Sequence, residues 1–230
     1  MKRGKLFYCT RFFVRLGLGR WTADVARPEE PVVYVCSHSN LRGPLAAMAW
    51  LPFAVRPWTL HVFLDRETCR KQYREYTFSE RFGLPGPLAA FLAWAVSGYV
   101  SGLMKSMGAL PVYRGTARIG TTFRETLAAL QAGDSVLIFP DVDYTDSSGG
   151  IGEVYDGFLL IERFWRKTSG RPLRFVPLRL DAVSRRITEG RAVSFDRGRE
   201  WRTEMNRVRE ALRAEINRSE TPRLRTDTFS

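Results

Sequence analysis

Short runs of β-branched and aromatic residues alternate along this chain with longer segments that carry apolar residues at helical spacing. Strand-like runs lie at Val32 to Cys36, Trp58 to Leu64, Leu110 to Tyr113, Ser135 to Phe139, Leu173 to Leu180 and Ala192 to Phe195. Helix-like segments lie around Leu45 to Phe53, Leu88 to Met107, Thr121 to Gln131 and Phe158 to Lys167. Gly133 and Gly170 stand where helix C-caps are expected. The alternation predicts an α/β fold, a single domain with a mixed central sheet flanked by helices.

The amino-terminal residues mix large apolar groups with cations. The apolar set includes Leu6, Phe7, Phe12, Phe13, Leu16 and Trp21, and the cations are Lys2, Arg3, Lys5, Arg11, Arg15 and Arg20. This mixture is typical of a basic amphipathic helix that lies in the interface of an anionic leaflet. The alternative is a helix that packs its apolar stripe on the protein's own core and leaves its arginines in water.

The carboxyl-terminal pattern predicts a final amphipathic helix. From Glu200 to Arg218, apolar residues recur on one face and arginines surround the rest, which is typical of a helix at the edge of a core. The residues after Ser219 read as a polar tail. We therefore expect a membrane-contact segment at residues 1–24, an α/β domain at 25–219 and a tail at 220–230.

Two uncharged runs need to be considered as membrane segments. The run from Gly43 to Val55 is too short to cross about 30 Å of hydrocarbon, so it predicts a buried helix. The run from Phe82 to Met104 has the length, but Pro85 and Pro87 interrupt it. A core helix that begins near Pro87 is favoured over a span, and a partly immersed helix lies between these readings.

Composition bounds the size of the domain and the nature of its partners. The 230 residues are 44% hydrophobic, enough for one sizeable core. The net charge of +12 favours polyanionic partners, whether nucleic acid, anionic lipid headgroups or phosphorylated substrates. The three cysteines show no metal-ligand spacing, so neither a disulfide framework nor a metal site is expected.

A histidine lies on the polar turn that follows the first apolar run. His38 stands in Val35-Cys36-Ser37-His38-Ser39-Asn40-Leu41-Arg42-Gly43-Pro44, between a predicted strand and a predicted helix. An imidazole fixed at such a junction is a candidate general base, because the scaffold holds the ring while its tip meets substrate. The alternative is an ordinary loop histidine.

Three later segments follow His38 in a recognisable order. They are Gly108 to Arg114, Phe139-Pro140-Asp141 and Val176-Pro177. With His38 they resemble the four sequence blocks of the glycerolipid acyltransferases, the enzymes that acylate glycerol 3-phosphate and lysophosphatidic acid. The resemblance covers roughly residues 30–180. It implies an acyltransferase of phospholipid synthesis, peripheral or monotopic at the cytoplasmic face of a membrane, with no cofactor.

The resemblance also implies partners and roles. The donor is an acyl-CoA or acyl-carrier-protein thioester and the acceptor is a phosphate-bearing lipid, with an anionic membrane surface as partner and no nucleic acid. His38 acts as general base, and Arg114 holds the acceptor phosphate through paired hydrogen bonds. Arg42 is a weaker candidate for the same duty, and Gly108, Phe139 and Pro140 match substrate-binding positions. Backbone N–H groups from Leu41 to Gly43 are candidates for stabilising the oxyanion.

Two positions depart from the family pattern. The family keeps an aspartate five residues after its histidine, where this chain has Gly43, and the family's Glu-Gly is replaced by Asp141-Val142. Either Asp141 or Asp143 reaches the imidazole, or the enzyme works without such a partner, or the site is no longer catalytic. Asp141 and Asp143 also suit a turn, because the segment that follows is rich in turn-forming residues.

Three functions therefore stay open from the sequence. The first is the acyltransferase, and the second is a lipid-binding relative of the same fold that has lost catalysis. The third is a nucleic-acid-binding protein, which only the charge and the aromatic content favour.

Overall fold

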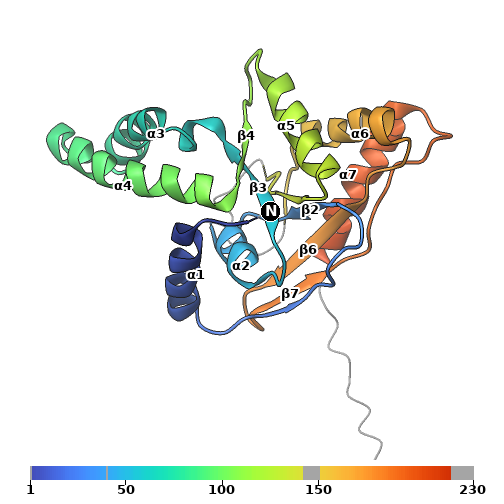
Figure 1. Cartoon of the computed structure of the whole chain (residues 1–230), viewed down its shortest axis with the longest axis horizontal. Coiled ribbons are helices and arrows are strands. Elements are labelled where there is room, and N and C mark those ends of the chain that lie inside the picture. The colour runs from blue at the N-terminus through green and yellow to red at the C-terminus, as the bar shows by residue number, and fades with distance from the viewer. Residues whose placement is uncertain (1, 40, 142–150, 219–230) are drawn as a thin grey trace, which may run out of the picture.

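A parallel sheet with an antiparallel addition at one side forms the centre of the fold (Figure 1). The computed structural model describes residues 2–39, 41–141 and 151–218. Within these ranges seven strands pair in the order β1-β7-β6-β2-β5-β3-β4. They are β1 (Thr22–Asp24), β2 (Val33–Cys36), β3 (Val55–Leu60), β4 (Leu110–Val112), β5 (Ser135–Ile138), β6 (Phe175–Asp181) and β7 (Arg186–Glu189). Because β7 runs antiparallel to β6 while β2 to β6 are parallel, the predicted mixed α/β fold is confirmed.

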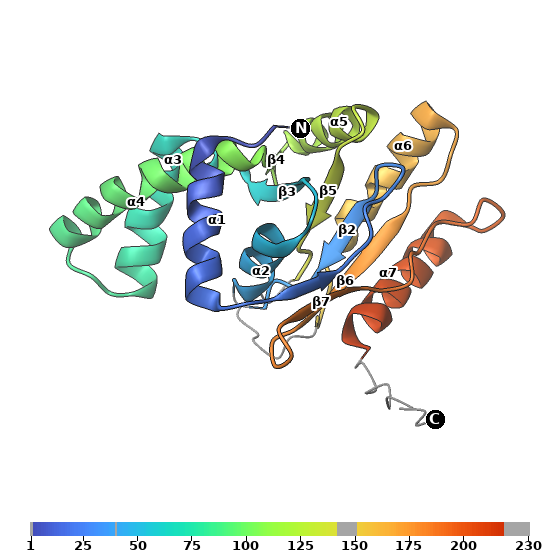
Figure 2. The same ribbon diagram turned by 60° about the horizontal axis from the view of Figure 1, so that its bottom comes forward.

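Helices cover both faces of this sheet (Figures 1 and 2). The α-helices are α1 (Lys5–Leu18), α2 (Arg42–Trp50), α3 (Arg66–Gln72), α4 (Gly86–Met107), α5 (Ile119–Gln131), α6 (Ile161–Ser169) and α7 (Trp201–Asn217). Two short 3-10 segments, η1 (His61–Phe63) and η3 (Asp156–Leu160), and a π-helix, η2 (Tyr73–Arg81), complete the described helices. Helices α5, α6 and α7 pack on one face, and α1 and α2 pack on the other.

The alternation of side chains along β2 explains why a short apolar run becomes its central strand. Val33 and Val35 point into the core shared with α5, α6 and α7, whereas Tyr34 and Cys36 point into the core shared with α1 and α2. Successive side chains of a strand point to opposite faces, so a strand covered on both faces must be apolar throughout. All four residues of β2 are buried.

Helices α3 and α4 and the π-helix η2 form an arm that projects from the body of the molecule (Figure 1). Helix α4 is long and apolar enough to cross a membrane by length and composition. It begins with Pro87 in its first turn, as predicted. The prediction of a core helix is wrong, however, because only 22% of the most apolar stretch of α4 is buried. Small residues such as Ala89 and Ala93 face inward, and large ones face outward.

Several predicted boundaries also need correction. The run from Trp58 to Leu64 leaves the sheet after Leu60, where η1 begins. The run from Ala192 to Phe195 is not a strand, since it makes only an isolated bridge between Val193 and Phe175. The prediction missed strands β1 and β7. It also missed the helical segment from α3 to η2. Their apolar content is too low to predict a strand or a helix from the sequence. The proposed tail at residues 220–230 lies outside the described residues.

Candidate active site

His38 and the segment after β5 meet at one edge of the sheet. Strands β2 and β5 are parallel neighbours, so their carboxyl ends lie side by side. The backbone N–H of His38 donates to Oδ2 of Asp141 at 2.8 Å, and the hydroxyl of Ser37 donates to Oδ1 of the same carboxylate at 3.1 Å. Asp141 is only 9% exposed. The carboxylate therefore holds the main chain of the histidine turn against the end of β5.

The His38 imidazole is half-buried between two described neighbours. The ring of Phe139 packs edge-on against it with 5.8 Å between centroids. The backbone N–H of Leu41 donates to its Nδ1 at 3.3 Å. An Nδ1 that accepts a hydrogen bond carries no proton, so this contact favours the neutral tautomer with its proton on Nε2. Burial lowers the pKa of His38 below its usual value of 6.5, which keeps the ring neutral at pH 7.

The turn that carries His38 is tight and uses its own donors. Ser39 and Leu41 adopt left-handed backbone conformations, with φ of 40° and 72°. Such conformations are unfavourable for residues other than glycine and recur at functional sites. The N–H of Arg42 donates to Ser39 O and that of Gly43 to His38 O, both at 3.1 Å. The expectation that N–H groups from Leu41 to Gly43 stabilise an oxyanion is wrong for this conformation, because all three are engaged within the turn.

Gly43 is glycine because its backbone lies directly against the end of β2. A Cβ built at this position would lie 2.0 Å from the carbonyl oxygen of Ser37 and 3.0 Å from that of His38. Both obstacles are backbone atoms that cannot rotate away. An aspartate at the family position therefore does not fit this backbone, and any carboxylate partner of the imidazole must come from another segment.

Arg114 reaches the same segment after β5 through an aromatic ring. It follows β4, which is separated from β2 in the sheet by β3 and β5. Its guanidinium lies 4.3 Å from the ring centroid of Tyr155, and the N–H of Tyr155 donates to Pro140 O at 2.9 Å. Arg42 is exposed at the first residue of α2, close to His38 in sequence. The structure thus brings His38, Phe139, Pro140 and Asp141 together, and links Arg114 to them only through Tyr155.

Two further predicted site residues, Gly108 and Asp143, do not join this group in the described structure. Gly108 is the left-handed C-cap of α4 and lies before β4, at the opposite end of that strand from Arg114. Its carbonyl accepts a hydrogen bond from Arg56 at 2.8 Å, so its evident role is structural. Asp143 lies outside the described residues. Within residues 2–39, 41–141 and 151–218 no cluster of three or more His, Cys, Asp or Glu side chains could hold a metal ion.

Three contributors to this site were not singled out from the sequence. They are the Ser37 hydroxyl, which binds Asp141, the contact of the Leu41 N–H with the imidazole, where only an oxyanion role had been expected for that group, and Tyr155, which lies beneath Arg114. The serines on both sides of His38 could have indicated a side-chain hydrogen bond at this turn, because serine commonly hydrogen-bonds within turns. Nothing local in the sequence pairs Tyr155 with Arg114.

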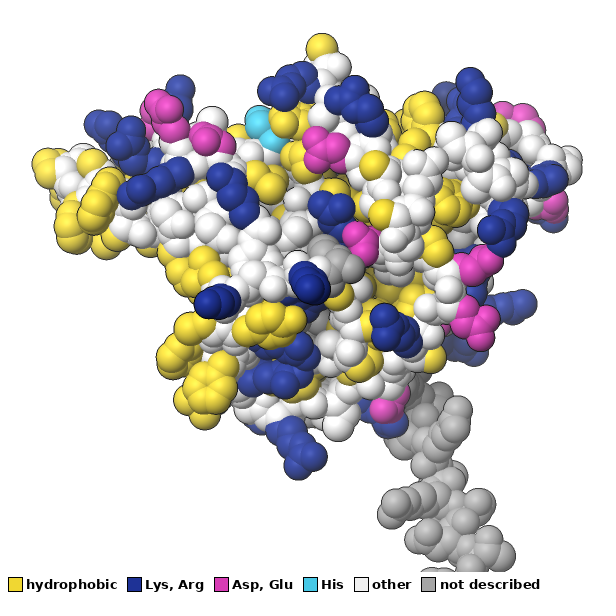
Figure 3. All heavy atoms as spheres, viewed as in Figure 1, with side chains coloured by type: hydrophobic (Ala, Val, Ile, Leu, Met, Phe, Trp, Pro, Cys, Tyr) yellow, Lys and Arg dark blue, Asp and Glu magenta, His cyan; other side chains and the backbone are white. Residues whose placement is uncertain are grey.

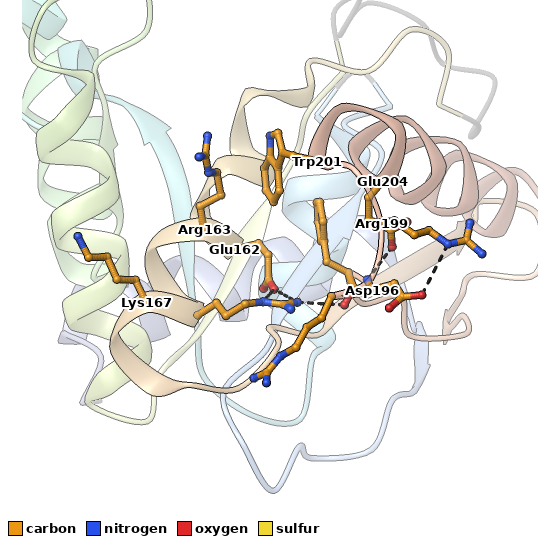
Figure 4. Close-up of a pocket in the computed structure, with 10 residues that line it drawn as sticks. Glu162, Arg163, Lys167, Asp196, Arg199, Trp201 and Glu204 are labelled. Atoms are coloured by element: carbon orange, nitrogen blue, oxygen red, sulfur yellow. Dashed lines mark hydrogen bonds and ion pairs between the residues drawn. The ribbon is translucent and has the colours of Figure 1, made fainter.

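A cleft of about 440 Å³ lies elsewhere, between α6 and α7 (Figure 4). Two buried carboxylates are among the residues that line it. Glu162 accepts from Arg166 at 2.6 Å and from the N–H of Leu173 at 2.7 Å, and Glu204 is bound by Arg207 and by the N–H of Asp196. Leu173 precedes β6, so this cleft lies toward the opposite edge of the sheet from His38. Its carboxylates fasten neighbouring segments to the two helices, and we assign it no catalytic role.

Comparison with known proteins supports the fold. No family model and no curated protein sequence matches this chain. The structure is similar to the crystal structure of the 1-acyl-sn-glycerophosphate (LPA) acyltransferase, PlsC, from Thermotoga maritima, with a TM-score of 0.53 and 11% sequence identity. The match covers 91% of this chain and 78% of the other. At this identity the likeness shows an acyltransferase-like fold.

Proposed function

We propose that this protein transfers a fatty acyl group from an acyl thioester to the hydroxyl of a lysophospholipid or a glycerol phosphate at a membrane surface. The fold is similar to that of a 1-acyl-sn-glycerophosphate acyltransferase, which supports this proposal. The observation that carries the proposal is the junction of β2 and β5, where Asp141 fastens the turn of a neutral, half-buried histidine. In open α/β sheets, ligands bind at the carboxyl ends of the strands.

His38 is the proposed general base. The acceptor hydroxyl attacks the thioester carbonyl and gives its proton to the imidazole, and collapse of the tetrahedral intermediate breaks the C–S bond. The departing thiolate takes that proton, so an ester and a free thiol are the products. General base catalysis of this kind contributes roughly 10²- to 10⁴-fold. The reaction needs an unprotonated ring nitrogen facing the hydroxyl, which the lowered pKa of His38 favours.

Arg114 is the proposed ligand of the acceptor phosphate. Its side chain is exposed at the same edge of the sheet and stacks over Tyr155, which holds the guanidinium near the segment after β5. A guanidinium offers paired donors that suit a phosphate. Arg42, at the start of α2, is the second candidate for this role.

An exposed aromatic surface on α1 and α4 supports membrane contact. Phe12 and Phe13 of α1 are each 63% exposed, and Phe91 and Trp94 of α4 are 63% and 54% exposed. Apolar side chains gather over both helices in Figure 3. The helices are joined by a hydrogen bond of 2.9 Å between the hydroxyls of Thr10 and Tyr99. Large exposed apolar patches mark membrane or protein contacts, so we propose a peripheral or monotopic enzyme that inserts these side chains.

One observation favours a second candidate, a lipid-binding relative without catalysis. With Leu41 donating to Nδ1, the proton of the neutral ring is on Nε2, which then donates and cannot accept the hydroxyl proton. In an active enzyme the ring must instead carry its proton on Nδ1, and a carboxylate must accept a hydrogen bond from that N–H. We propose that Asp143 supplies this carboxylate, since Gly43 has no side chain to do so.

The proposed function is tested by an acceptor panel. Palmitoyl-CoA and palmitoyl-carrier protein are each incubated with lysophosphatidic acid, glycerol 3-phosphate or monoacylglycerol, and free thiol and acylated product are measured together. We expect product only with phosphate-bearing acceptors and a rise in KM for them in Arg114→Met. Asp143→Ala should lower kcat. Binding of lysophosphatidic acid without any thiol release would instead support the lipid-binding relative, and activity on monoacylglycerol alone would refute the role of Arg114.

A further inference from the structure

Two arginines of α1 are turned inward onto the end of α2. The Nε atoms of Arg11 and Arg15 donate to the carbonyl oxygen of Ala49 at 2.7 and 2.8 Å. Arg11 also donates from Nη2 to Leu51 O at 3.4 Å, and the guanidinium of Arg15 lies 5.8 Å from the ring centroid of Trp50. These arginines were expected to face anionic headgroups. In the structure both donate to protein carbonyls instead.

The end of α2 needs these arginines. The last carbonyls of a helix lack partners within the helix and carry the negative end of its dipole. Helix α2 has no basic residue in its own last turn. Two arginines one turn apart on α1 repel each other, and their convergence on Ala49 O offsets that repulsion. Arg11 is close enough to Arg15 that the second charge, after burial, contributes to lowering the pKa of Arg11.

The other end of α2 holds the candidate base. Gly43, in the first turn of α2, donates to His38 O, and Leu41, its N-cap, donates to His38 Nδ1. Between the two ends, Ala46, Ala47 and Ala49 are at most 2% exposed. A short helix packed this closely moves as one body, since packed interiors transmit displacements with little slack. Its nine residues span about 14 Å.

The outward face of α1 carries the aromatic surface described above. Phe12, Phe13 and Leu16 are exposed there, while Phe7 on the inward face is buried. Helix α1 therefore contacts the proposed lipid surface with one side and α2 with the other.

We propose that Arg11 and Arg15 are positioning residues for His38, which link the membrane-facing helix α1 through α2 to the histidine turn. Lipid contact by the exposed face of α1 orders α1, the two arginines fix the carboxyl end of α2, and the opposite end of α2 sets the hydrogen bond at Nδ1. The consequence for catalysis rests on the function proposed above. The structural link from α1 to the imidazole is independent of that function.

The test follows the imidazole directly by NMR, because the chain has only two histidines. Long-range proton–nitrogen spectra of protein labelled with ¹⁵N-histidine report the tautomer of His38, and His61 serves as an internal control. His61 lies apart from α2, stacked on Tyr113. The test variant is Arg11→Met/Arg15→Met. The control is Arg202→Met/Arg213→Met, which removes two exposed cations from α7 on the other side of the sheet.

We expect the ring nitrogen signals of His38 to shift and broaden in Arg11→Met/Arg15→Met, because the histidine turn is then held less firmly, with His61 unchanged and no shift in the α7 control. Unchanged His38 signals in the folded test variant would overturn the proposal. If the double variant does not fold, the single Arg15→Met, whose side chain is the more exposed of the two, is measured in the same way and judged by the same shift.

Lipid and activity measurements complete the test. Adding bicelles of phosphatidylcholine and phosphatidylglycerol should shift the His38 signals in the unmodified protein but not in Phe12→Ser/Phe13→Ser, and equal shifts in both would refute the link. Arg11→Met/Arg15→Met should lower kcat roughly 10- to 100-fold with little change in KM, as for a misplaced catalytic group. Arg11→Lys/Arg15→Lys should recover part of the loss. NMR shifts without any acyl transfer would refute the proposed function and leave the positioning role supported.

Discussion

Replacing Gly43 with alanine should damage both the fold and the candidate site, although alanine normally stabilises a helix by about 1 kcal/mol relative to glycine. The new Cβ would lie 2.0 Å from Ser37 O, so the two atoms must separate by about 1.4 Å to reach ordinary contact. Overpacking of this kind costs typically about 1–3 kcal/mol. Because the obstacles are backbone atoms of the histidine turn, the separation must move either α2 or His38.

The effect on turnover follows from the same displacement. A shift of about 1 Å in a catalytic group can cost roughly 100-fold. The assay measures the free energy of unfolding in urea by tryptophan fluorescence, and thiol release from palmitoyl-CoA with lysophosphatidic acid. Gly120→Ala is the matched control, because Gly120 lies in α5 with nothing within 4 Å of a built Cβ. We expect Gly43→Ala to lower stability and activity, and Gly120→Ala to raise stability without affecting activity.

Two results would refute this reasoning. One is a Gly43→Ala protein as stable as Gly120→Ala, since the close approach of α2 to β2 would then be absent. The other is a gain in rate for Gly43→Asp, because that substitution restores the family residue at a position where the backbone leaves no room for it.

Three further predictions concern the pH dependence, the carboxylate and the membrane. Because burial lowers the pKa of His38 below 6.5, kcat/KM should rise through that lowered pKa and be flat above pH 7, and a rate still rising between pH 7 and 8 would contradict this. Asp141→Ala leaves the His38 N–H and the Ser37 hydroxyl without this acceptor, so the free energy of unfolding in urea should fall by at least about 1–3 kcal/mol, and an unchanged value would refute the anchoring role. Phe12→Ser/Phe13→Ser should reduce sedimentation with vesicles at least about tenfold, through lost apolar burial, on neutral and anionic lipids alike; undiminished sedimentation would exclude this surface.

The sequence predicted the central strands and the helices around them because their signal is local. The run from Val32 to Cys36 is apolar throughout, as a strand covered on both faces must be. The left-handed backbone at Gly133 and Gly170 was likewise readable from glycine placement. Strands β1 and β7 escaped prediction because they are short and largely polar, and their pairing with each other and with β6 comes from tertiary contact.

The site was predictable in part. The position of His38 after a strand and the approach of Phe139 and Asp141 follow from the parallel pairing of β2 with β5. The role of Asp141 toward the backbone of His38 did not follow, because a motif states which residues are near and not which atoms bond. The inward orientation of Arg11 and Arg15 was also hidden, since helical periodicity cannot say which cation finds a carbonyl.

The most direct test of the account compares the two histidines of the chain. Palmitoyl transfer from palmitoyl-CoA to lysophosphatidic acid is measured by mass spectrometry of the lipid product, with the unmodified protein, His38→Ala and His61→Ala in the presence of vesicles. The account predicts product with the unmodified protein and with His61→Ala, and a loss of roughly 10²- to 10⁴-fold with His38→Ala. Transfer that persists at the unmodified rate in a folded His38→Ala protein would contradict the central claim.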